Sequence, residues 1–436
     1  MSKYDKASLV HIPSGYKSGT LYNVLPNDAD GDFDFFRGST ATRVDKNGLI
    51  ETIATGTPRL DYPLLDGVVQ DNPTLLLEPQ RTNLVTYSED FSNSSWTKIA
   101  ISVSTNNTSS PDGSVTADKI TESATSSEQT LYYETSVTTG TKYTLSLFVK
   151  KSERRWFFLR FGAAFGAFTN AFAWFDLENG LLGSKEAGID NYSIDNYGNG
   201  WYKVTATATS IATVTGRFFY GMATSDGVKS YTGDGTSGVF IWGAQIEQGS
   251  YPTSYIPSLT GSQTTRSADV CNGAGTAADF NDSEGVLYAN IAALADDLTY
   301  RELGISDGTT NNRVLISYTN VSNQISGSIR VGAVTQGIMN YTAPSILHIN
   351  KACIRYKLND CSLWVNGFEV AVDTSVNMPS GLSELAFDSG AGNDDFYGKT
   401  KEVITFNEAL SDTELEALTS YRSFTEMAKG QLYTIE

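Results

Sequence analysis

The chain has 436 residues, of which 49 are acidic and 31 basic, so its formal net charge is −18 at pH 7. This balance argues against nucleic acid and anionic membrane surfaces as partners, because both require clustered Lys and Arg. The first residues lack the apolar core of a signal peptide, and no run approaches the roughly 20 apolar residues that span a bilayer. We therefore expect synthesis in the cytoplasm and no membrane insertion.

The composition is typical of an all-β protein. Charged residues make up only 18% of the chain and aromatic residues 11%, and there are 39 glycines. Thr and Tyr suit half-buried strands, while Gly and Asn suit the turns between them. At this length the chain has room for two or three domains with separate cores.

Residues 1–80 contain frequent turn signals and only short apolar runs, such as 21–25 and 75–77. A segment of this kind lacks the periodicity to bury much surface by itself. We expect residues 1–80 to form an assembly or attachment arm that drapes over a neighbouring domain or subunit.

The alternating acids of residues 28–34 invite a calcium interpretation. An EF-hand loop, however, needs Gly at its sixth position and Glu at its twelfth. Counted from Asp28, Gly31 is fourth and Ser39 is twelfth. We expect a solvated turn before a strand at 33–36.

Strand-like runs recur between turns over residues 81–260. The last run, 239–246, leads into an extended stretch that contains Pro252 and Pro257 and so cannot be helical. Seven or eight such strands around one core are typical of a jelly-roll β-sandwich. The expected strands are 130–135, 141–150, 156–161, 171–176, 201–209, 215–221 and 239–246.

Residues 261–282 are rich in Gly and other small residues, and we expect a linker there. A second β-domain is expected over residues 283–436. It closes with one helix, because Ser411 and Glu414 form a capping box before an apolar stripe. Its expected strands are 285–292, 313–318, 326–331, 345–357, 362–368 and 401–406.

Several motifs in these segments resemble known proteins. The runs LLLEPQRTNLVTYSEDFSNSSW (75–96), GWYKV (200–204) and IWGAQIEQGSYPTSYIP (241–257) resemble a carbohydrate-binding-module-like jelly roll found in structural proteins of tailed bacteriophages. The stretch 30–62 looks like the segment that often precedes that module. LWVNG (363–367) and KEVITFNEALSDTELEALT (401–419) are similar to laminin-G/concanavalin A-like lectin modules. The resemblance implies a virion fibre, spike or decoration protein.

The sequence offers little for nucleophilic, zinc or nucleotide chemistry. Its two histidines, His11 and His348, are far apart, and we expect His348 to be structural on a strand. A serine triad needs a positioned His, and zinc sites need more His and Cys. The three cysteines, Cys271, Cys353 and Cys361, show no CxxC spacing and are expected to be free thiols.

A glycosidase is the enzymatic alternative, because it needs only two suitably spaced carboxylates. The concanavalin-like glucanases carry acids at alternating positions of one strand, and residues 284–436 contain no such run. Glu384 and Asp388 lie in the run 383–389 but do not reproduce that pattern of acids. The resemblance is therefore to the binding members of that superfamily.

Sugar binding requires flat aromatic faces with Asn, Asp or Gln nearby. Tyr192 and Tyr197 lie in a loop-like run, 189–200, and are the best candidates. Other candidate residues in the jelly roll are Trp156, Trp174 and Tyr231.

Two further expectations concern a metal and an interface. Jelly rolls of the resembled type often carry a structural Ca²⁺, and Glu89, Asp90 and Glu247 would reach one site if the first and last strands paired. The run 160–175 is more apolar than one sheet face requires. It indicates either an oligomer interface or a sheet with both faces covered.

Our leading hypothesis is a non-enzymatic phage virion component, a tail or head fibre or spike. Its arm would attach it to other virion proteins, and its two β-domains would bind bacterial surface glycans. We expect a homo-oligomer, with a trimer as the default. The alternatives are a capsular polysaccharide depolymerase and a passive capsid decoration protein.

Overall fold

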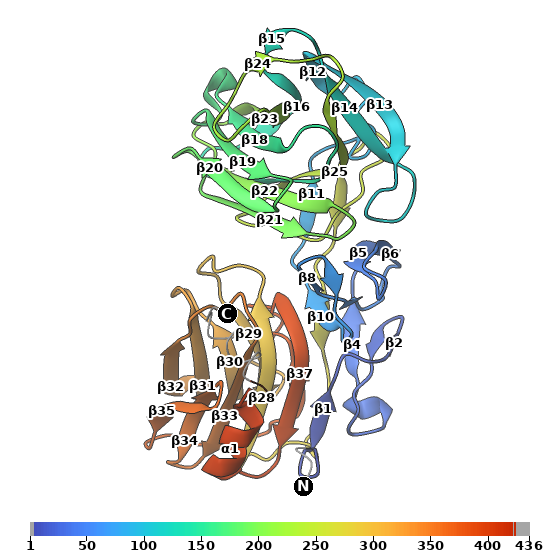
Figure 1. Ribbon diagram of the computed structural model, residues 1–436. Coiled ribbons are helices and arrows are strands. Elements are labelled where there is room, and N and C mark those ends of the chain that lie inside the picture. Colours follow the sequence, from blue (N-terminus) through green and yellow to red (C-terminus); the bar gives the residue numbers. More distant parts are fainter. Residues whose placement is uncertain (1–3, 422, 424–436) are drawn as a thin grey trace.

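The computed structural model describes residues 4–421 and residue 423. Almost all of their regular structure is β-strand, arranged as two sandwiches with the N-terminal segment beside the lower one (Figure 1). The expected all-β fold is confirmed. Within the described residues no helix is long and apolar enough to cross a membrane.

The upper sandwich is the jelly roll, and it consists of two six-stranded antiparallel sheets. In strand order, sheet 1 contains β12 (Thr97–Ile99), β16 (Gln129–Val137), β23 (Val214–Ala223), β18 (Trp156–Gly162), β19 (Ala171–Asp176) and β20 (Leu181–Lys185). Sheet 2 contains β13 (Ile101–Thr108), β14 (Ala117–Glu122), β25 (Gly238–Gln248), β17 (Lys142–Lys151), β22 (Trp201–Thr209) and β21 (Asn191–Asn196).

Side-chain alternation builds the core between these sheets. In β18, Phe157, Leu159 and Phe161 belong to the central core, whereas Phe158 belongs to a separate cluster on the outer face. All seven strands expected in this domain are present, with ends within two residues of those predicted. The expected strands did not include β12, β13, β14, β20 and β21. β21 corrects the expected loop at 189–200, which was missed because this strand lies at a sheet edge and its side chains are mostly polar.

The lower sandwich joins an eight-stranded sheet 3 to a five-stranded sheet 4. Sheet 3 contains β35 (Phe368–Asp373), β34 (Cys361–Val365), β33 (Asn350–Lys357), β28 (Glu284–Ala293), β37 (Gly398–Phe406), β10 (Thr74–Leu77), β7 (Leu60–Asp61) and β1 (Leu9–His11). Sheet 4 contains β32 (Val334–Thr342), β31 (Gln324–Val331), β30 (Arg313–Tyr318), β29 (Arg301–Ser306) and β36 (Glu384–Ala386).

The expected helix is α1 (Asp412–Thr419), and its capping box is present. The Ser411 amide donates to Glu414 Oε2 at 2.9 Å. Leu415 and Leu418 are buried against sheet 3. The helix therefore begins where the sequence predicted, because the signal for its start is local.

The N-terminal segment supplies strands to sheet 3 rather than standing apart. β1 and β10 both pair with β37, so that Leu9 lies opposite Thr405 and Leu75 opposite Thr400. The expected arm thus covers the edge of the C-terminal sandwich (Figure 1). Its role in attaching the protein to a particle stays a prediction.

Short pairings complete this segment, the expected linker and the jelly-roll loops. They comprise β2 (Tyr16–Lys17), β3 (Thr20–Leu21), β4 (Phe33–Phe36) and β27 (Val270–Asn272); β5 (Ala41–Val44) with β6 (Ile50–Ile53); β8 (Leu64–Leu65) with β9 (Val68–Val69); β11 (Arg81–Asn83) with β26 (Thr264–Arg266); and β15 (Ser126–Ser127) with β24 (Tyr231–Thr232). Two 3₁₀ turns are η1 (Ala29–Gly31) and η2 (Ala164–Gly166). The strand expected at 33–36 is β4.

A buried ionic cluster, which we call the joint, fastens these segments together. Arg59 contacts both Glu78 and Asp269, while Arg266 donates to Glu78 at 2.7 Å and Arg37 to Asp269 at 3.1 Å. All five side chains are at most 3% exposed. Since they come from the arm, the end of β10 and the expected linker, the joint fixes these segments relative to one another.

The histidines and cysteines have structural positions. His348 lies in an exposed bend, which corrects the expectation of a strand, because the apolar run around it is too short to pair before Asn350. His11 is buried in β1. All three cysteines are free and buried, and Cys353 lies opposite Trp364 rather than opposite Cys361.

Candidate functional site

The outer face of sheet 2 is covered by other parts of the chain. Ile50 of the arm packs with Trp242 and Tyr255 in a buried cluster on this face. The Thr42 hydroxyl donates to the Tyr255 carbonyl at 2.5 Å, and the Lys203 ammonium donates to the Thr253 carbonyl at 2.8 Å. The part of this face around Trp242 and Tyr255 is therefore used in joining the segments.

The outer face of sheet 1 carries an aromatic row with cations lying on it. Tyr132, Phe219, Arg160 and Phe172 are successive cross-strand neighbours. The Arg160 guanidinium lies 4.2 Å from the Phe219 ring centre and 5.0 Å from that of Phe172, and Arg217 lies 5.0 Å from that of Tyr132. Cation–π contacts of this kind occupy the ring faces that a sugar would need.

The two predicted sugar-binding tryptophans, Trp156 and Trp174, lie at the end of this row. Trp174 is 2% exposed, stacks on Phe172 and donates its indole N–H to the Val228 carbonyl at 3.0 Å. This burial leaves the Trp174 ring no exposed face for a sugar. Trp156 is half-buried in the same cluster, and the Arg155 guanidinium lies 5.5 Å from its ring centre.

The predicted tyrosine of β24 is also engaged. The Tyr231 hydroxyl donates to Glu122 at 2.6 Å, and the Arg154 guanidinium lies 5.4 Å from its ring centre. Burial, together with the hydrogen bond to Glu122 and its negative charge, raises the pKa of Tyr231 well above its ordinary value, against the opposing effect of Arg154. Tyr231 is half-buried, and its hydroxyl and ring are both engaged by charged side chains, those of Glu122 and Arg154.

The structure separates the two remaining tyrosine candidates. Tyr192 is half-buried at the rim of the central core, and its hydroxyl donates to the Gly183 carbonyl at 2.9 Å. Tyr197 packs edge-on against Phe148, on the covered outer face of sheet 2. Burial raises the pKa of Tyr197 well above its ordinary value. The five predicted residues thus do not converge on one site.

A groove elsewhere on the jelly roll combines an aromatic ring with several hydrogen-bond acceptors. It has a volume of about 400 Å³, in the range of small-molecule sites. We call it the acidic groove. Its lining residues are Tyr87, Glu89, Asp90, Ser92, Thr105, Asn106, Thr116, Asp118 and Leu259.

Local structure explains the shape of the acidic groove. The ladder between β13 and β14 is interrupted after Ser104, which leaves Asn106 in a left-handed conformation outside the pairing. The backbone N–H of Asn106 donates to one carboxylate oxygen of Asp118, and the backbone N–H of Phe91 donates to the other, both at 3.0 Å. Asp118 therefore connects the two walls of the groove, the segment around residue 91 and the segment around residue 106.

Two carboxyl groups of the groove, those of Asp118 and Glu89, lie in an environment that disfavours their charged form. Burial raises the pKa of Asp118 to about 6, against the two N–H groups that it accepts. Burial likewise raises the pKa of Glu89, whose Oε1 accepts the Tyr255 hydroxyl at 2.9 Å. Tyr87 is half-buried beside them, and Leu259 is 54% exposed.

The structure brings together two of the three residues predicted to bind Ca²⁺. Glu89 and Asp90 both line the groove, whereas Glu247 is fully buried and accepts the Thr253 amide at 3.0 Å. In the described part of the chain, no group of three or more His, Cys, Asp or Glu side chains is arranged to hold a metal ion.

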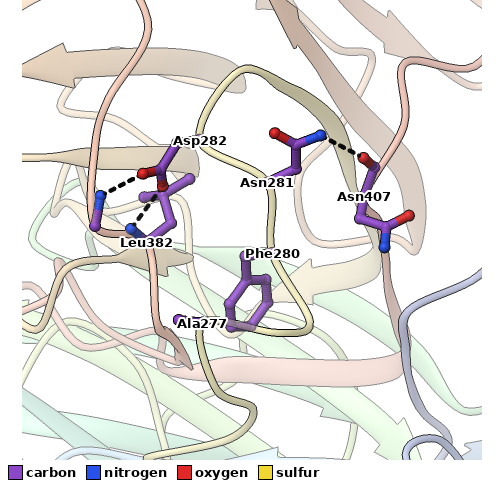
Figure 2. Close-up of a pocket in the computed structure, with 7 residues that line it drawn as sticks. Ala277, Phe280, Asn281, Asp282, Leu382 and Asn407 are labelled. Carbon is purple, nitrogen blue, oxygen red and sulfur yellow. Dashed lines mark hydrogen bonds between the residues drawn. The ribbon is translucent and has the colours of Figure 1, made fainter.

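A second hollow lies where the expected linker meets the C-terminal sandwich (Figure 2). Asp282 accepts the amides of Gly381 and Leu382 at 2.7 and 2.9 Å, and the Asn281 side chain donates to the Asn407 carbonyl at 2.9 Å. These polar groups anchor the expected linker to the C-terminal sandwich, and we therefore assign the hollow a structural role.

Comparison with solved structures gives distant likenesses. No family model and no curated protein matches the chain. Among solved structures, the CBM40 domain of Ruminococcus gnavus IT-sialidase, bound to α2,3-sialyllactose, is 16% identical, with a TM-score of 0.28, over 32% of this chain and 84% of that one. NanB sialidase of Streptococcus pneumoniae (K499G mutant) is 19% identical, with a TM-score of 0.27, over 33% and 25%. Mouse laminin α1 domains LG4–5 are 8% identical, with a TM-score of 0.22, over 78% and 96%.

Sequence reasoning missed two central residues of the groove. Tyr87 stands in the quoted run 75–96, two positions before Glu89, but its exposure depends on residues near 259. Asp118 stands between the buried residues Ala117 and Ile120, and an acid within such a run is the signal that would have found it.

Proposed function

We propose that this protein is a non-enzymatic carbohydrate-binding protein and that the acidic groove holds the saccharide. The observation that supports this proposal is that one half-buried tyrosine ring, one exposed aliphatic side chain and several acceptors line the same groove. Sugar rings present C–H groups to aromatic and aliphatic surfaces and hydroxyls to polar groups. Tyr87 and Leu259 supply the first surface, and Glu89, Asp90 and Asn106 supply the second.

The wider biological setting rests on the sequence resemblance. The motifs at 75–96, 200–204 and 241–257 support a role as a bacteriophage virion component of the fibre, spike or decoration type. In this setting the saccharide is a bacterial surface glycan, and the chain is part of a homo-oligomer bound to other virion proteins. The lectin-like C-terminal sandwich extends the contact surface.

We propose binding rather than hydrolysis at this groove. Both oxygens of Asp118 accept backbone N–H groups, so this carboxyl has a positioning role in the groove walls. A glycosidase instead needs one carboxylic acid free to protonate the leaving group. Release of reducing sugar from host capsule by the purified chain would favour the depolymerase alternative and overturn this part of the proposal.

Glycan-array screening of the purified chain, followed by calorimetry on the best ligands, tests the site. We expect Tyr87→Ala to weaken binding at least tenfold, because it removes the stacking ring, and Tyr87→Phe to keep most of the affinity. The matched control is Tyr300→Ala, which removes a 42% exposed ring from the C-terminal sandwich. If Trp156→Ala abolished binding while Tyr87→Ala did not, the site would be sheet 1 instead.

A further inference from the structure

Given the proposed function, the acidic groove also carries information about the class of saccharide. Its lining contains three carboxyl groups, Glu89, Asp90 and Asp118, and no Lys or Arg. The other lining side chains are hydroxyl, amide and apolar groups. A ligand in this groove therefore meets mainly hydrogen-bond acceptors.

The electrostatic surroundings do not neutralise these acids. The charged neighbours that raise the pKa of Glu89 are Asp112 and Asp118, and the one that raises the pKa of Asp118 is Asp90. Lys98, which donates to the carbonyls of Ser92 and Asn93 at 2.9 and 2.6 Å, interacts with Asp90 and offsets one negative charge of the three carboxyl groups in the lining. The groove thus has a local excess of negative charge.

We infer that the acidic groove binds neutral, hydroxyl-rich saccharides and discriminates against saccharides that carry carboxylates. Neutral sugars donate hydroxyl protons to the carboxylate oxygens, and charge-assisted hydrogen bonds of this kind are the stronger ones. An acidic sugar would bring a like charge within a few ångströms of Glu89 and Asp90, where repulsion in a partly desolvated groove exceeds that in bulk water. Specificity then arises from repulsion as well as attraction.

The test uses matched pairs of oligosaccharides and the full chain, with EDTA present. Each neutral oligosaccharide that binds is compared with the same compound oxidised at C6 to the uronate. We expect the uronate to bind at least tenfold more weakly at pH 7.5 and low salt. Raising the salt concentration to 0.5 M should narrow this ratio, because screening weakens the repulsion.

Variants locate the discrimination. Glu89→Gln and Asp90→Asn should each reduce the ratio of neutral to uronate affinity several-fold, because each removes one charge from the groove. The matched control is Glu416→Gln, which removes one exposed charge from α1. This control should leave the ratio unchanged, which separates the local effect from the net charge of −18.

The outcomes are distinguishable. Equal or tighter binding of the uronates, with Tyr87→Ala still weakening both ligands, would overturn the inference and leave the proposed function standing. Binding of neither ligand, or binding insensitive to Tyr87→Ala, would overturn both. Saturable Ca²⁺ binding by calorimetry without EDTA, lost in Glu89→Gln, would identify a cation site and overturn the inference.

Discussion

Asp118 shows how one buried side chain organises the candidate site. Its carboxyl group joins residue 91, which precedes β12, to residue 106 in the interrupted part of β13. The side chain is 1% exposed, and its pKa is raised to about 6 by burial. The folded state therefore binds a proton at Asp118 more tightly than the unfolded state does.

This difference predicts a specific pH dependence of stability. Because the folded pKa lies above the unfolded value of 3.8, the Asp118 contribution is fully present below about pH 4 and is lost as the pH rises through 6. Relative to Asp118→Asn, the wild type should lose about 2 kcal/mol of unfolding free energy between pH 4 and pH 7. Denaturant unfolding of both proteins at several pH values measures this. A difference that is constant with pH would contradict it.

At the scale of elements, glycines in sheet 1 make room for large rings. A Cβ atom on Gly221 of β23 would lie 2.3 Å from the Phe158 ring, and one on Gly162 of β18 would lie 2.5 Å from that of Phe219. Phe158 lies opposite Gly221 in the ladder, and Phe219 lies diagonally across from Gly162, two positions from its partner Arg217. For the apolar run 160–175, the sequence left open an oligomer interface or a sheet covered on both faces. Phe172 of this run and the neighbouring Phe158 are buried within the chain, so at these two residues the outer face is covered.

We predict that Gly221→Ala destabilises the jelly roll by about 1–3 kcal/mol, because the Phe158 ring would have to leave its position. Thermal unfolding followed by near-UV circular dichroism measures the loss and reports the displaced aromatic ring. Gly15→Ala is the control, because its Cβ would meet only ordinary contact with Tyr22 at 3.5 Å. Equal stability of the two variants would show that sheet 1 accommodates the methyl group.

At the scale of the whole molecule, the joint connects segments that are far apart in the sequence. Burial raises the pKa of Glu78, but attraction to Arg266 and Arg59 outweighs it and holds this pKa well below its ordinary value. Asp269 accepts from Arg37, Arg59 and the Glu78 amide. Losing one acid would leave buried guanidinium groups without their partner.

Asp269→Ala should therefore cost about 3–5 kcal/mol, the usual penalty for an uncompensated buried charge. Denaturant unfolding measures this cost, and proteolysis should become faster in both the arm and residues 261–282. The control is Glu178→Ala, which removes an exposed ion pair with Lys151 and should cost at most about 1 kcal/mol. A similar cost for the two variants would mean that the joint does not hold the segments together.

The sequence by itself determined the elements whose signals are local. Alternation located the seven expected jelly-roll strands, and the Ser411–Glu414 pair located α1, because side-chain period and capping depend on residues a few positions apart. The polar edge strand β21 was missed, since a strand at a sheet edge needs no apolar row.

Only the tertiary structure decided how these elements meet. Pairing of β1 with β37 joins residues almost 400 positions apart, and the joint brings together residues up to 232 positions apart. The acidic groove needs residues 87, 106, 118 and 259 to converge, and no local pattern encodes that convergence. The physical reason is that strand periodicity determines on which face of its own strand a side chain lies. Long-range pairing and burial determine which other segments that face packs against.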